Sequence, residues 1–144
     1  MSVTVTRMIE LAEALVDTPT LSVFISTEST RRRGGTHGVW CTEVTAFAES
    51  VRGRFAGGLA RADREVFERN LRRLALRLRG LPHAVRAAGW LVIVARGDVH
   101  YCAPVSFAGK SEAHWQHGPW LTLLFAPTAI ASHAAPFMPT ARAP

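Results

Sequence analysis

Lysine is nearly absent from this sequence. Lys110 is the only one in 144 residues, so arginine supplies almost all of the 17 basic side chains. Cysteine is scarce too, since Cys41 and Cys102 lie far apart and form no Cys-x-x-Cys pair. We therefore expect no disulfide, and we expect both thiols to be buried as small apolar side chains.

Long hydrophobic runs are also missing. No stretch approaches the roughly 18–20 consecutive apolar residues that a membrane-spanning helix needs. Charged residues interrupt the N-terminal segment, which excludes the continuous apolar centre of a secretory signal. These residues are Arg7, Glu10, Glu13 and Asp17. The sequence predicts a cytoplasmic protein that contacts no membrane.

The proportions of apolar and charged residues are those of a globular domain. Apolar residues make up 48% of the chain and charged residues 19%, and the formal net charge is +6. The length suits one domain. Arginine presents a planar fork that binds phosphates in a bidentate manner, so RNA or another polyanion is a candidate partner. A genome rich in G and C would also produce many arginines, and this alternative stays open.

Three segments have the periodicity of amphipathic helices: residues 6–16, 39–55 and 61–79. In the third, apolar residues form one narrow stripe and four arginines project from the opposite side: Arg69, Arg72, Arg73 and Arg77. Glu65 and Glu68 precede two of these arginines by four residues, so we expect the ion pairs Glu65–Arg69 and Glu68–Arg72.

Short apolar runs predict the strands. Leu21–Ile25 reads as a buried strand, and Gly89–Ala95 reads as a central strand whose hairpin partner is Val99–Ala103. Residues 104–119 are expected to be a connection, and residues 120–125 either a last strand or the start of a helix. The fold class expected is a single α/β domain with a mixed sheet of about four or five strands packed by two or three helices.

Two boundaries follow from composition. Residues 1–126 are expected to form the domain, and residues 127–144, rich in proline and alanine, a disordered tail. The polar segment 27–38 is expected to be a loop where the chain leaves a strand and enters a helix, a common place for ligand contacts in open α/β sheets. Arg31, Arg32 and Arg33 lie in this loop beside flexible glycines, where they are able to neutralise phosphates.

Few residues point to catalysis. His114 and His117, with His100 as a third partner, form the best metal pattern, but carboxylate or cysteine partners at suitable spacing are missing. Cys41 with His37 is a candidate nucleophile and base, and Ser26 and Ser106 have no Gly-x-Ser-x-Gly context. No cofactor motif is present, and the sequence indicates no enzyme.

Three stretches resemble the N-terminal domain of the bacterial archaeo-eukaryotic release factor family, relatives of the eukaryotic and archaeal peptide chain release factors. They are residues 89–105, residues 21–27, and residues 114–121 with their Gly-Pro-Trp-Leu ending. The resemblance covers roughly residues 6–125 and implies an α/β domain that acts in translation. In that family, peptidyl-tRNA hydrolysis belongs to a middle domain with a Gly-Gly-Gln or similar loop. Here the proline-rich tail stands where that domain would begin, and Gly34-Gly35-Thr36 has threonine in place of glutamine. The Asn-Ile-Lys-Ser signature of codon reading is also missing.

The resemblance and the charge together predict a non-catalytic, translation-associated domain that binds the ribosome or structured RNA. The expected contacts are Arg31, Arg32, Arg33 and His37 in the loop, and Arg69, Arg72, Arg73 and Arg77 on the helix. A protein-interaction or dimerisation module, with Trp115 and Trp120 as an aromatic patch, is the alternative. A metal-dependent hydrolase built on His100, His114 and His117 is the third hypothesis.

Overall fold

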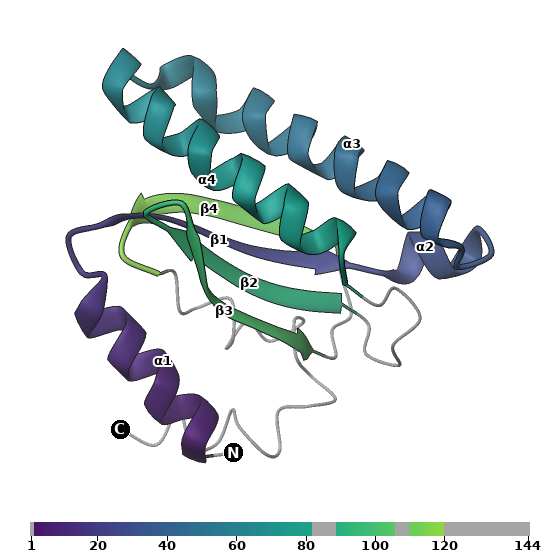
Figure 1. Cartoon of the computed structure of the whole chain (residues 1–144), viewed down its shortest axis with the longest axis horizontal. Coiled ribbons are helices and arrows are strands. Elements are labelled where there is room, and N and C mark those ends of the chain that lie inside the picture. Colours follow the sequence, from purple (N-terminus) through teal and green to yellow (C-terminus); the bar gives the residue numbers. More distant parts are fainter. Residues whose placement is uncertain (1, 82–88, 106–109, 120–144) are drawn as a thin grey trace.

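The computed structural model describes residues 2–81, 89–105 and 110–119, which form four helices and a four-stranded sheet (Figure 1). In chain order the elements are α1 (Ser2–Ala14), β1 (Pro19–Ser26), α2 (Glu28–Arg32), α3 (His37–Phe55), the 3-10 turn η1 (Ala56–Gly58), α4 (Arg61–Arg79), β2 (Gly89–Ala95), β3 (Asp98–Val105) and β4 (Glu112–His117). The expected α/β class is confirmed. The predicted tail, 127–144, and the apolar run 120–125 lie outside the described residues.

The strand order is β3-β2-β1-β4, and every pairing among these strands is antiparallel. This is more regular than the mixed sheet expected. β1 and β2 are neighbours although α2, α3 and α4 separate them in the sequence. The long insertion is accommodated because α3 and α4 form a hairpin that returns the chain to the same end of the sheet, where Gly89 pairs with Ser26.

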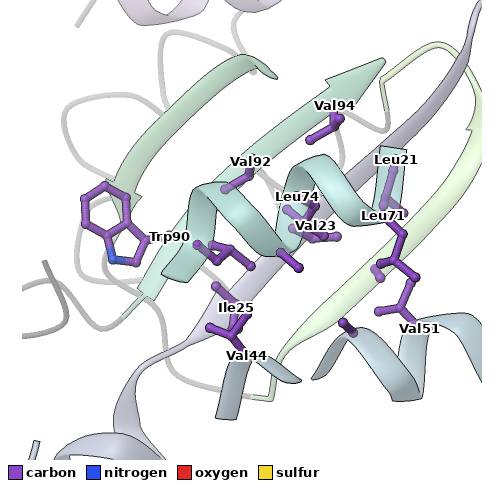
Figure 2. Close-up of a cluster of buried hydrophobic side chains, with 14 of the residues drawn as sticks. Leu21, Val23, Ile25, Val44, Val51, Leu71, Leu74, Trp90, Val92 and Val94 are labelled. Atoms are coloured by element: carbon purple, nitrogen blue, oxygen red, sulfur yellow. The ribbon is translucent and has the colours of Figure 1, made fainter. Parts of the chain in front are cut away.

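The main core lies between the sheet and the helical hairpin, as Figure 2 shows. Alternate residues of β1 and β2 point toward the helices, including Leu21, Val23 and Val92, and all three are fully buried. Val44 of α3 and Leu74 of α4 pack against them from the helical side. Each such aliphatic side chain contributes about 1.5–3 kcal/mol when it is buried.

α1 lies on the other side of the sheet, away from α3 and α4 (Figure 1). Met8 and Leu11 of α1, and Leu15 directly after it, are buried, as the helical spacing predicts. The turn after α1 is tied to the sheet, because the Gly118 amide donates a 2.9 Å hydrogen bond to the Thr18 carbonyl.

The long helices match their predicted ranges closely. α4 occupies the predicted residues 61–79, and α3 begins two residues early because the Thr36 hydroxyl caps it, accepting a 3.2 Å hydrogen bond from the Val39 amide. Two expectations were wrong. The segment expected to be only a loop contains α2, and part of the connection expected between residues 104 and 119 is strand β4.

Candidate functional site

The four arginines predicted to share the outer side of α4 divide between two flanks of that helix. Arg69, Arg73 and Arg77 recur every four residues and form what we call the arginine stripe. The stripe lies over the β2–β3 hairpin, because the Arg69 side chain packs beside Gly97 and Arg77 hydrogen-bonds Cys102. Arg72 lies on the flank that faces α3.

The ion pairs expected within α4 do not form: neither Glu65–Arg69 nor Glu68–Arg72 comes within salt-bridge distance in the described chain. Glu68 instead accepts two hydrogen bonds, of 2.9 and 3.1 Å, from Nε of Arg52 on α3. Sequence spacing along one helix cannot reveal a partner that a neighbouring helix supplies. Arg69 and Arg72 are therefore left without a carboxylate.

Arg52 is the centre of the strongest ionic cluster in the described part of the chain. It also donates a 2.5 Å hydrogen bond to Glu49, one turn earlier on α3. The hydrogen bonds to Glu68 and then to Glu49 raise the pKa of Arg52 above its usual range. This arginine joins α3 to α4, and its charge is already neutralised.

Arg31, Arg32 and Arg33 all remain exposed, at the end of α2. Arg32 lies 3.4 Å from Glu28 and Arg33 lies 3.5 Å from Glu43, so two of the three already have a carboxylate partner. Exposed pairs of this kind contribute about 0–1 kcal/mol, so a phosphate is able to compete for both arginines.

A cavity of about 380 Å³ opens where β1 ends and α2 begins. Phe47 and Ile25 contribute apolar lining. Two acidic and two basic residues supply its charges: Glu28, Glu43, Arg32 and Lys110. The Ser111 hydroxyl accepts a 2.8 Å hydrogen bond from the Ser26 amide and closes one side. Residues 27–38 were expected to contact a ligand because ligands often bind where the carboxyl ends of parallel strands meet. That reason does not apply to this antiparallel sheet.

His37 and Cys41 do come together, with Nε2 and Sγ 3.4 Å apart, because they are one turn apart near the start of α3. Both cysteines are free, but each is only half-buried, so the expected full burial was wrong. Burial raises the pKa of the Cys102 thiol, and the hydrogen bond from Arg77 partly opposes this.

The three histidines of the metal hypothesis do not meet, and no group of three metal-binding side chains exists among the described residues. His114 and His117 both lie on β4, where a spacing of three residues puts side chains on opposite faces. His100 lies on β3, at the other edge of the sheet, and its Nε2 is 3.1 Å from the Ala95 carbonyl. In a helix, residues three apart would lie on the same side, but this segment is a strand, so His114 and His117 do not face one another.

Trp115, the described member of the expected aromatic patch, packs edge-on against Phe67, with ring centroids 5.2 Å apart. It is half-buried at the margin of the core. Trp120 lies outside the described residues.

No protein-family model matches this chain, and no curated protein sequence matches it significantly. Among the described helices, none is long and apolar enough to cross a membrane.

Proposed function

We propose that this chain is a translation-associated domain that binds ribosomal or transfer RNA through the arginine stripe. The observation that carries the proposal is the uncompensated charge of Arg69, Arg73 and Arg77, none of which has a carboxylate partner in the described residues. The stripe spans about 12 Å along the helix axis, which is enough to contact more than one phosphate.

The resemblance to the N-terminal domain of bacterial archaeo-eukaryotic release factors supports translation as the setting. That resemblance rests partly on residues 89–105, which form the β2–β3 hairpin that lies under the stripe. A net charge of +6 would steer the chain toward polyanions. Arg31, with Arg32 and Arg33 once their weak surface pairs are exchanged for phosphates, would form a second contact together with the neighbouring His37.

The direct test is sedimentation of the full chain with purified ribosomes, and with unfractionated tRNA in a gel-shift assay, across a salt series. Each phosphate contact contributes about 0.7–0.9 to the slope of log affinity against log salt. Replacing Arg69, Arg73 and Arg77 together by Gln should therefore lower that slope by about 2–3. Replacing Arg31, Arg32 and Arg33 by Ala should have a smaller effect.

A matched control removes the same number of charges elsewhere. Arg7 on α1, Arg54 at the end of α3 and Arg61 at the start of α4 are exposed and lie off the stripe. The Arg7, Arg54 and Arg61→Gln variant should keep nearly the original affinity. Equal losses in the two triple variants would mean that only net charge matters, and the stripe would be discarded.

A further inference from the structure

The outer side of the helical hairpin carries a groove of about 350 Å³ between α3 and α4. This side faces away from the sheet, and none of the described elements lies over it (Figure 1). The groove lies on the flank of α4 opposite the arginine stripe, so its role is separable from RNA binding.

The groove has an aliphatic floor. Ala48 of α3 and Leu71 and Ala75 of α4 line it, and the two small side chains let a neighbouring segment approach the helices closely. Leu76, at the same groove, is 60% exposed. The other large exposed apolar residues of the described chain, Ile9 and Val16, belong to α1 and the turn after it.

The rim of the groove is positively charged. Three arginines and one glutamate line it, and the glutamate, Glu49, is already paired with Arg52. Arg72 has no carboxylate partner among the described residues, and Arg79 donates a 3.2 Å hydrogen bond to the neutral hydroxyl of Thr45. Two positive charges therefore flank an aliphatic floor without compensation.

We propose that this groove binds an acidic amphipathic helix of a partner protein. A third helix laid between α3 and α4 would place its apolar side chains on Ala48, Ala75 and Leu76. Its carboxylates would pair with Arg72 and Arg79, and Arg79 would give up only a bond to a neutral hydroxyl. The net charge of +6 favours the approach of an acidic partner.

Two other occupants fit the groove less well. The lining contains no aromatic ring on which an RNA base would stack, whereas single-stranded RNA gains much of its affinity from such stacking. A second copy of the chain carries the same net charge of +6, which opposes self-association.

The test uses a designed peptide as the probe. A fluorescein-labelled peptide of about 20 residues has Leu and Ala on one helical face and Glu on the other, long enough to form a helix. A second peptide has Lys in place of every Glu. Fluorescence anisotropy of each peptide is followed as the full chain is added. The acidic peptide should bind at least about tenfold more tightly than the basic one, and less tightly as salt rises.

Two variants locate the binding site. Leu76→Ser should weaken binding of the acidic peptide by about tenfold, the change expected from losing one buried aliphatic contact. Val16→Ser is the matched control, because Val16 is 61% exposed and lies away from the groove. Arg72→Gln should also weaken binding and reduce its salt dependence. Urea denaturation of each variant establishes that it is folded.

Four results would overturn the proposal. One is equal binding of the two peptides, and another is a Leu76→Ser variant that binds the acidic peptide like the original chain. Displacement of the acidic peptide by tRNA from the Arg69, Arg73 and Arg77→Gln variant would instead make the groove an RNA site. Self-association in sedimentation velocity that Leu76→Ser abolishes would make a second copy the occupant.

Discussion

The indole Nε1 of Trp40 donates a 2.6 Å hydrogen bond to the carbonyl of Leu78. Trp40 lies in the first turn of α3 and Leu78 in the last turn of α4, so this bond joins the two ends of the helical hairpin. The terminal carbonyls of a helix lack their usual partner within it. The Leu78 carbonyl accepts a 3.2 Å hydrogen bond from the Leu81 amide, and Trp40 adds a second donor inside the core. The same ring is fully buried and fills the space between the helices.

Trp40→Phe should therefore be destabilising beyond the loss of ring volume. The substitution removes this donor and leaves the Leu78 carbonyl with the Leu81 amide alone, so the lost hydrogen bond costs about 0.5–1.5 kcal/mol. Trp90→Phe is the matched control, since Nε1 of Trp90 is buried and has no hydrogen-bond partner in the described structure. Urea denaturation should show a larger loss for Trp40→Phe. Equal losses would mean that the hydrogen bond contributes nothing.

Gly89, at the start of β2, has no room for a side chain. A Cβ there would overlap the carbonyl of Ile25 and come within 2.6 Å of the Phe24 ring. Gly89→Ala should destabilise the fold by about 1–3 kcal/mol, as overpacking of a core does. Gly53→Ala should have the opposite effect, stabilising α3 by about 0.5–1 kcal/mol, because nothing lies within 4 Å of that position. Thermal unfolding of both variants checks this: the melting temperature should fall in Gly89→Ala and rise in Gly53→Ala.

The elements predicted correctly are those whose pattern of apolar and polar residues matches the way they pack in the structure. α4 has a strong apolar stripe and ends at Arg79, directly before Gly80, and its range was predicted correctly. β4 was missed because Glu112–His117 is a polar sequence with little strand character. It becomes a strand by pairing with the edge of β1, a tertiary interaction that outweighs local propensity.

The sequence predicted which residues belong to the candidate site, but it did not predict which of them form ion pairs. The arginines of α4 are exposed or half-buried, as the helical periodicity predicted, but they divide between two flanks of the helix. Which of them keep a free charge depends on Arg52, which lies on a different helix and takes Glu68 away from Arg72. The groove beside α3 also arises only when the two helices pack together, so no motif in the sequence indicates it.

Asn70 of α4 anchors the β2–β3 turn. Its Oδ1 accepts a 2.8 Å hydrogen bond from the Gly97 amide, and Asn70 is fully buried. Asn70→Ala should cost about 1–3 kcal/mol, because the amide loses its buried acceptor. Thr30→Val is the control, since its buried Oγ1 has no partner in the described chain, and that change should be nearly neutral. Hydrogen exchange of the Gly97 amide should become faster in Asn70→Ala only.

His114 should make the stability of the fold depend on pH. Burial lowers the pKa of its imidazole from 6.5, and the nearby Glu112 carboxylate, 3.6 Å away, only partly opposes this. The unfolded chain therefore takes up a proton at a higher pH than the folded chain does. The free energy of unfolding is fully retained above pH 6.5 and falls as the pH drops from there toward the folded pKa.

His114→Gln removes this proton uptake, so its stability should decline less than that of the original chain between about pH 7 and pH 5. Urea denaturation at several pH values measures the difference. His117→Gln removes an exposed imidazole from the same strand and serves as the control for the loss of a histidine. If both variants follow the pH profile of the original chain, the loss of stability belongs to other groups. If His114→Gln alone has the flatter profile, proton binding at this half-buried imidazole is the cause.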